Sequence, residues 1–210
     1  MLEYILIEEH SYSRYNHLLT TINPEQIILL PQQLINKLNL SDSSIDLVAI
    51  IKIIPSPKLI VDSEQDYLLL EQIQDPGNLG TILRVAKASG LKNVLLSAQS
   101  VDLYNPKVLR ASQGIQFGLN LYTNIDLFEF CTNYTGQIYA LTPHANLSIY
   151  QQNLQKPTAL VFGNEGSGIS PQLLSHIQTH ITIPMRGNAE SLNLAMAVTA
   201  SAFELSRQRL

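Results

Sequence analysis

The sequence has only one cysteine, Cys131, so it cannot form an internal disulfide. The five histidines are scattered, and neither they nor Cys131 show the spacing that metal ligands require. We therefore predict that Cys131 is a small buried apolar residue and that the chain holds no metal.

Long apolar runs are also absent. The run at residues 45–54 is broken by Asp46 and Lys52, and no segment reaches the ~18–20 residues that a membrane-spanning helix needs. Residues 1–9 carry glutamates where a secretory signal would carry basic residues. We expect a cytoplasmic protein that does not enter a membrane.

Charged residues make up only 14% of the chain, and the net charge of −4 argues against a uniformly basic nucleic-acid binder. The hydrophobic share of 45% is enough to bury a core. From Arg84 to Arg110, however, five basic residues stand against Asp102, a local excess of four positive charges. Such a patch could follow RNA phosphates, but charge alone favours an ordinary solvated face.

The chain divides by regularity into a small unit at residues 1–60 and a larger one at residues 62–210. Pro55 and Pro57 fix the backbone twice between them and predict a stiff connector. In the first unit we expect a turn at Asn23, a helix at residues 31–38 and a strand in residues 47–54.

From Tyr67 onward, apolar strand-like runs alternate with helix-like segments. This rhythm predicts an α/β fold with a mostly parallel sheet covered by helices on both faces. The expected strands are residues 67–70, 93–97, 119–122, 137–142, 158–163 and 180–184.

Two helices bear on function. The apolar spacing of residues 79–89 predicts a helix that ends at Gly90 and displays Arg84 on its polar face. A second helix is expected after Ser191, which is a candidate cap. The apolar surface of this second helix is so broad that it fits either core packing or a contact with a second subunit.

Three polar segments each follow an expected strand and lead into a helix: residues 75–84, 160–168 and 183–194. Loops at the carboxyl ends of parallel strands are where ligands bind in open α/β sheets. Residues 163–168 lack the Lys-Ser/Thr ending of a P-loop and the spacing of a dinucleotide fingerprint, so a phosphate cradle is not expected. Each segment alone also fits an ordinary turn or a capped helix, with Asn78 as the cap of the first.

Taken together, the stretches DPGNLGTILRVAKASG, LVFGNEGSGIS and IPMRGNAESLNLAMA resemble the three ordered motifs of the SpoU/TrmH family. These are SPOUT-type RNA 2′-O-ribose methyltransferases, and the resemblance extends from about Tyr67 to the C-terminus. It implies S-adenosylmethionine as the cofactor, a homodimer and a C-terminal trefoil knot, which is a rare exception among protein folds.

The resemblance also implies which residues form the site. The matching catalytic positions are Asn78, Arg84, Glu165, Ser191 and Asn193. The matching cofactor-binding positions are Leu141, Thr142, Gly163, Asn164, Glu165, Gly166, Ile183, Met185, Ser191, Leu192 and Asn193, with Pro143 and His144 nearby.

For Arg84, the resemblance implies that it activates the ribose hydroxyl. A guanidinium has a pKa above ~12, so an orienting and charge-stabilising role is physically easier than that of a base. Ribosomal RNA is the expected substrate, with transfer RNA and a non-catalytic RNA-binding role as alternatives. Residues 1–60 resemble a shortened α/β substrate-binding unit, which leaves the choice of RNA open.

Overall fold

The computed structural model describes residues 2–38, 45–187 and 189–210. The chain forms two compact units, Met1–Pro55 and Ser56–Leu210. None of the helices in these described residues is long and apolar enough to cross a membrane.

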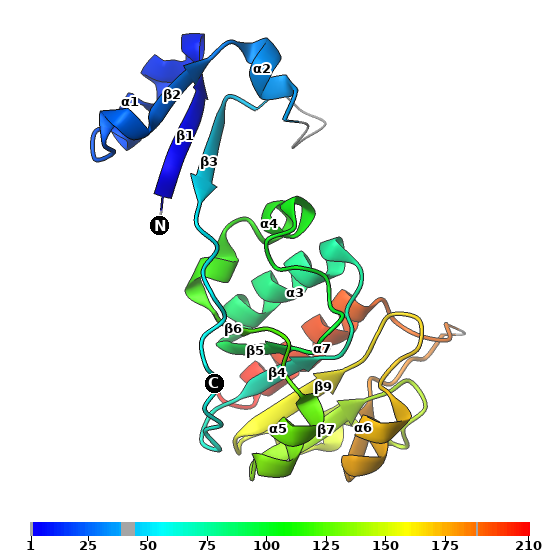
Figure 1. The fold of residues 1–210 in the computed structure, drawn as a ribbon. Helices are drawn as coiled ribbons and strands as arrows, with labels where there is room; N and C mark the ends of the chain where they lie inside the picture. Colours follow the sequence, from blue (N-terminus) through cyan, green and yellow to red (C-terminus); the bar gives the residue numbers. More distant parts are fainter. Residues whose placement is uncertain (1, 39–44, 188) are drawn as a thin grey trace. The chain divides into compact units, whose positions relative to one another are not determined.

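The first unit is built on a three-stranded sheet in the order β2-β1-β3 (Figure 1). Strand β1 pairs in parallel with β2 and antiparallel with β3. The elements in chain order are β1 (Leu2–Glu8), α1 (Tyr12–Leu19), β2 (Ile27–Leu30), α2 (Gln32–Asn36) and β3 (Leu47–Ile51), with short 3-10 turns at Glu9–Ser11 and Pro24–Gln26.

One face of this small sheet carries the core of the first unit, where Ile5, Ile7 and Leu19 are buried. The other face bears Tyr4, which lies opposite Ile50 in the ladder and is 45% exposed. Strand β1 supplies the centre of the sheet and α1 follows it, because the alternation of buried and open positions in Leu2–Glu8 suits a strand with one covered face.

The second unit contains a seven-stranded sheet in the order β6-β5-β4-β9-β7-β10-β8, and every pair in it is parallel. All six strands expected from the sequence are present. The strands are β4 (Tyr67–Leu70), β5 (Asn93–Leu96), β6 (Asn120–Tyr122), β7 (Gln137–Leu141), β8 (Leu147–Ser148), β9 (Thr158–Phe162) and β10 (Thr179–Thr182).

Helices cover both faces of this sheet, as the sequence predicts (Figure 1). They are α3 (Pro76–Ser89), α4 (Pro106–Ser112), α5 (Leu127–Asn133), α6 (Pro171–His176) and α7 (Leu194–Arg207), with 3-10 turns at Ile115–Gly118 and Ile149–Gln151.

The two sides of the sheet hold separate apolar cores. Strand β4 shows the division: Leu68 and Leu70 face the core under α3, α4 and α7, whereas Leu69 faces the core under α5 and α6. Cys131 lies in the second of these cores, and burial raises the pKa of its thiol to about 12, so the prediction of a buried apolar role is confirmed.

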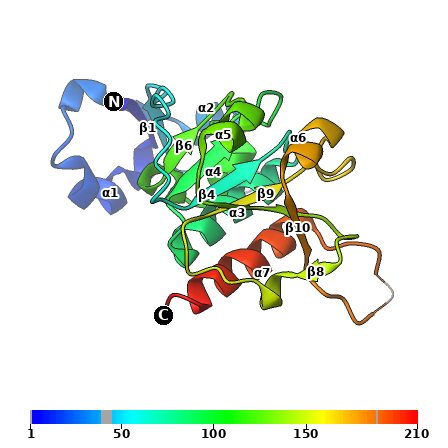
Figure 2. The ribbon, with the colours of Figure 1, turned by 90° about the horizontal axis from the view of Figure 1, so that it is seen from below.

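Helices α3 and α7 pack alongside each other on one face of the sheet (Figure 2). A close approach between α3 and α4 depends on Gly80, since an added Cβ would lie 2.4 Å from Cβ of Ala111. Helix α3 ends at Gly90 in the left-handed conformation, with φ of 87°, as predicted.

The caps of α3 and α7 differ from the predicted ones. Asp75, not Asn78, caps α3 and accepts a hydrogen bond from the backbone N–H of Asn78 at 2.6 Å. Asn193, not Ser191, caps α7 and accepts from the N–H groups of Ala195 and Met196. Both helices therefore start at different residues from those expected, which frees Asn78 and Ser191 for other contacts. The trefoil knot stays a prediction from the family resemblance.

Candidate cofactor site

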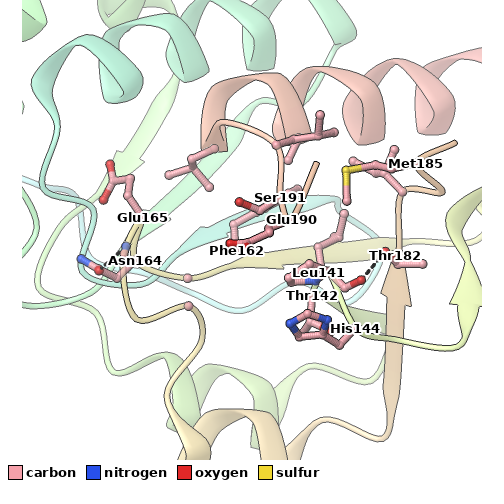
Figure 3. A pocket seen from close by; sticks show the side chains of 18 residues that line it. Leu141, Thr142, His144, Phe162, Asn164, Glu165, Thr182, Met185, Glu190 and Ser191 are labelled. Carbon is pink, nitrogen blue, oxygen red and sulfur yellow. Dashed lines mark hydrogen bonds between the residues drawn. The ribbon is translucent and has the colours of Figure 1, made fainter. Parts of the chain in front are cut away.

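A cavity of about 540 Å³ lies at the carboxyl ends of β7, β9 and β10. This volume is within the range of small-molecule sites, and the position is the one expected for a ligand in an open parallel sheet. Its walls come from three loops and the start of α7 (Figure 3). The lining residues are Leu141, Thr142, Pro143, His144, Phe162, Gly163, Asn164, Glu165, Gly166, Gly168, Thr182, Ile183, Met185, Glu190, Ser191, Leu192, Leu194 and Ala197.

Gly163 allows the loop after β9 to fold back on itself. A Cβ at this position would lie 2.1 Å from the backbone of Gly168 and Ile169, a distance that real atoms do not reach. Asn164 and Gly168 exchange two backbone hydrogen bonds across the turn, at 3.0 and 2.9 Å. Glycine is therefore required at 163 because backbone fills the space of a side chain.

The Asn164 side chain fixes the rest of this loop. Its Oδ1 accepts from the N–H groups of Gly166 and Ser167, at 2.9 and 3.0 Å, and its Nδ2 donates to the carbonyl of Gln72 at 2.8 Å. The loop after β9 is thus bound to the loop after the neighbouring strand β4.

Glu165 strengthens that connection. Its carboxylate accepts from the backbone N–H of Gln74 at 3.1 Å, from that of Asp75 at 3.2 Å, and from Nδ2 of Asn78 at 3.2 Å. Hydrogen bonds to a charged acceptor are stronger than those between neutral groups. The carboxylate therefore binds the loop after β4 and the start of α3, rather than its own loop.

Asn78 then connects to the third motif. Its Oδ1 accepts a hydrogen bond of 3.0 Å from Nδ2 of Asn193. A chain of side-chain contacts, Glu165 to Asn78 to Asn193, therefore joins all three sequence motifs. Asn193 uses its own Oδ1 for the cap of α7, so both ends of its amide are engaged.

Most of the predicted cofactor residues meet at the cavity. All of Leu141, Thr142, Gly163, Asn164, Glu165, Gly166, Ile183, Met185, Ser191 and Leu192 line it, whereas Asn193 does not. Figure 3 shows Asn164 and Glu165 at one end of the cavity and Met185 and Thr182 at the other, with Glu190 and Ser191 between them.

Arg84 is not brought into the cavity. It is an exposed residue of α3, and its guanidinium makes no hydrogen bond or ion pair with the residues that the structure describes. The guanidinium is therefore available to a group from outside the subunit.

Six lining residues were not identified from the sequence: Phe162, Gly168, Thr182, Glu190, Leu194 and Ala197. The motifs contain or adjoin all of them, but no residue pattern distinguishes a side chain that lines a cavity from its neighbours. Among these six residues, only Glu190 has a charged side chain.

The SpoU rRNA Methylase family matches residues 66–203, which include all three motifs and every lining residue. The chain belongs to this family. A SpoU-family relative, the 23S rRNA (uridine(2479)-2′-O)-methyltransferase of Streptomyces viridochromogenes, is 30% identical over 203 residues, which cover 92% of this chain and 71% of that protein.

Two further relatives match a shorter share of the chain. The 23S rRNA (guanosine(2553)-2′-O)-methyltransferase RlmP of Bacillus subtilis is 36% identical over 157 residues, covering 72% of this chain and 61% of that protein. An uncharacterised tRNA/rRNA methyltransferase of Synechocystis is 40% identical over 145 residues, covering 68% and 53%. The matched part of the chain thus spans about half to two thirds of these two relatives.

Solved SpoU structures share the fold. The methyltransferase AviRb from Streptomyces viridochromogenes, in complex with AdoMet, is 25% identical, with a TM-score of 0.84 and coverage of 100% of this chain and 83% of that one. A second solved structure, of an RNA 2′-O ribose methyltransferase, is 29% identical with a TM-score of 0.80 and coverage of 100% of this chain and 82% of that one. The predicted α/β sheet and family are confirmed.

Proposed function

We propose that this protein transfers the methyl group of S-adenosylmethionine to a ribose 2′-hydroxyl of ribosomal RNA. The observation that carries the proposal is the hydrogen-bonded chain from Glu165 through Asn78 to Asn193, which ties the three family motifs together beside one cavity. Relatives named as 23S rRNA 2′-O-methyltransferases support the reaction and the substrate.

The cavity suits S-adenosylmethionine. Apolar side chains of Leu141, Ile183 and Leu192 line the cavity and can hold the faces of an adenine ring. When bound, the cofactor supplies a methyl group that is already activated by its positive sulfur. The protein therefore has mainly to exclude water and hold the ribose oxygen in line.

Arg84 is the residue that we assign to the reacting hydroxyl. As the oxygen gains the methyl group, its proton passes to solvent water, and a nearby guanidinium stabilises the negative charge that develops on the oxygen. The same planar group can bind the adjoining RNA phosphate through two parallel hydrogen bonds. Its exposure on α3 and its lack of partners among the described residues agree with this role.

We propose further that the enzyme acts as a homodimer in which Arg84 of one subunit serves the cofactor cavity of the other. Two observations support this. Arg84 does not line the cavity of its own subunit, and α7 exposes Met196 (59%) and Phe203 (47%) on one face, seven residues apart.

Mixing two inactive variants tests the shared site. Arg84→Ala lacks the guanidinium, and Asn193→Asp keeps an oxygen cap for α7 but loses the donor to Asn78. If Arg84 acts across the interface, mixed dimers regain one intact site, giving about one quarter of the wild-type rate in a randomly paired mixture. No recovery after proven subunit exchange, or a monomer by light scattering with full activity, would contradict the proposal.

The substrate is tested with labelled S-adenosylmethionine and separated RNA classes. We expect label in ribosomal RNA, in the cytoplasm where ribosomes assemble, and mapping of the modified nucleotide would identify the site. Transfer RNA is the second candidate, because a solved structure that concerns the 2-OH methylation of C/U34 on tRNA matches 70% of this chain at 27% identity with a TM-score of 0.62. Label in neither class by cofactor-bound protein would leave a non-catalytic RNA-binding role.

A further inference from the structure

The charges around the cavity are unusual for a site that would bind an anion. Among its lining residues the ionisable side chains are His144, Glu165 and Glu190, and neither lysine nor arginine is present. Two carboxylates and no fixed cation disfavour a phosphate and favour a ligand that carries positive charge.

The two carboxylates differ in whether hydrogen-bond donors of the protein already contact them. Glu165 accepts three hydrogen bonds from N–H groups, which spread and stabilise its charge. Glu190 has no hydrogen-bond or ion-pair partner among the residues described in the structure. Arg186, four residues before it, does not line the cavity and makes no ion pair with it.

The distance between the Glu190 carboxylate and a ligand charge determines how strongly the two attract each other. A sphere of about 540 Å³ has a radius of about 5 Å, so any ligand charge in it lies within roughly one Debye length of the wall at physiological salt. Figure 3 shows Glu190 between Asn164 and Glu165 at one end of the cavity and Met185 at the other. Its attraction therefore reaches a cationic ligand without requiring direct contact.

We propose that Glu190 makes the cavity select for the positive sulfonium of the methyl donor, so that the site binds S-adenosylmethionine more tightly than the demethylated product S-adenosylhomocysteine. The proposal rests on the function proposed above and adds a specificity-determining residue to it. The donor carries one net positive charge, and the product carries none because its sulfur is a neutral thioether. Methyl transfer thus removes the charge that Glu190 attracts, which favours exchange of product for fresh donor.

Calorimetric dissociation constants of the full-length protein test this with three ligands. Glu190→Gln should raise the dissociation constant of S-adenosylmethionine by about three- to tenfold, the effect expected for removing one charge roughly 6 Å from the ligand charge in a solvent-exposed site. Sinefungin carries an ammonium group in place of the sulfonium, and the substitution should weaken its binding to a similar extent. S-adenosylhomocysteine should change by less than about twofold.

Two matched variants complete the experiment. Glu190→Asp keeps the charge and should retain the preference, whereas Glu129→Gln removes an exposed carboxylate of α5 that does not line the cavity and should change none of the three constants. The wild-type preference for the charged ligands should also narrow as salt is raised, and the Glu190→Gln protein should show a weaker salt dependence because only the Glu165 carboxylate is left in the cavity wall.

Equal weakening of all three ligands by Glu190→Gln would overturn the proposal, since it would mean that Glu190 binds a group common to them, such as the ribose. No weakening of any ligand would also overturn it. Failure of the wild-type protein to bind any of the three ligands would instead contradict the proposed function itself.

Discussion

The two units of this protein bury their apolar residues in different ways. The first unit covers one face of a three-stranded sheet, over Ile5, Ile7 and Leu19, and leaves apolar residues such as Tyr4 and Ile50 exposed on the other. The second unit covers both faces of its sheet with separate cores. Every residue that lines the cofactor cavity belongs to the second unit. The unit whose sheet is covered on both faces therefore carries the cavity, and we propose that the first unit helps to select the RNA.

The sharpest test of the packed unit is Gly163→Ala. The new Cβ would meet backbone atoms of Gly168 and Ile169 at 2.1 Å, so the loop must open and the cavity should be lost. We expect a loss of more than about 4 kcal/mol in unfolding free energy and no measurable cofactor binding. Denaturant unfolding and calorimetry check both.

Gly187→Ala is the matched control, because a Cβ there has open space around it and its φ is unstrained. It should change the unfolding free energy by less than about 0.5 kcal/mol. A stable Gly163→Ala protein that binds cofactor normally would show that the loop is not as tightly packed as described.

Arg84→Ala separates chemistry from packing within the second unit. The side chain is exposed and does not line the cavity, so the fold and cofactor affinity should be unchanged. Methyl transfer should fall by at least ~100-fold, the usual scale for losing one charge-stabilising group. Single-turnover rates at saturating RNA and cofactor measure this effect.

Arg84→Lys should recover little activity, because a point charge cannot replace the planar guanidinium. Lys92→Ala, at another exposed basic position, serves as the control and should stay close to the wild-type rate. Near-normal turnover of Arg84→Ala, or a loss of cofactor binding, would show that its assigned role is wrong.

Removal of the first unit tests whether this unit contributes to RNA binding but not to cofactor binding. A chain of residues 56–210 should bind cofactor as the full protein does, but its affinity for RNA should fall by about tenfold or more, as expected when one of two linked binding modules is lost. Calorimetry and filter binding at fixed salt give the two constants. Complete loss of cofactor binding by a folded 56–210 chain would mean that the first unit completes the cavity.

The start at Ser56 matters for that experiment. Leu59 and Val61 pack against the core under α5 and α6, and Ser56 accepts a hydrogen bond of 3.1 Å from the N–H of Thr123. A cut at residue 62 would remove these contacts, so a failure to fold would say nothing about the first unit.

The smallest expected effect concerns Glu204 on α7. Two hydrogen bonds from Arg207 at 2.8 Å hold the pKa of this buried carboxyl below its usual 4.5. A lowered pKa stabilises the fold at pH values above 4.5, and the contribution is lost as pH falls through the lowered pKa.

Glu204→Gln should therefore lower Tm by about 2–4 °C at neutral pH, with the difference from wild type shrinking in acid. Thermal unfolding at neutral pH and below pH 4.5 checks this. A difference that is constant over this range would show that the carboxylate charge does not contribute.

The sheet of the second unit could be predicted because each of its central strands is a short continuous apolar run, as parallel strands buried on both faces must be. Strand β8 could not, because Leu147–Ser148 is too short to form a pattern. In the first unit, β1 was missed because its apolar residues are interrupted by Glu3 and Glu8, which is ordinary for a strand with one covered face.

The helix starts were predicted less well than the strands. Asp75 and Asn78 are both good caps, and only Pro76 at the first helical position indicated that Asp75 is used. The sequence offered no such signal to show whether Ser191 or Asn193 caps α7. The motif residues were found through their family resemblance, but the hydrogen bonds between Glu165, Asn78 and Asn193 join positions that local patterns cannot connect.

Strand β9 joins the two halves of the large sheet, since it pairs with β4 on one side and β7 on the other. As the chain leaves the ribosome, β4, β5 and β6 can pair with one another early, but β7 has no place beside them until residues 158–162 have emerged. The hydrogen bond between Asn193 and Asn78 must close a loop of 115 residues, and such distant contacts form slowly. We therefore expect the cavity to be completed late, after α7, which lines it through Leu194 and Ala197, has left the ribosome.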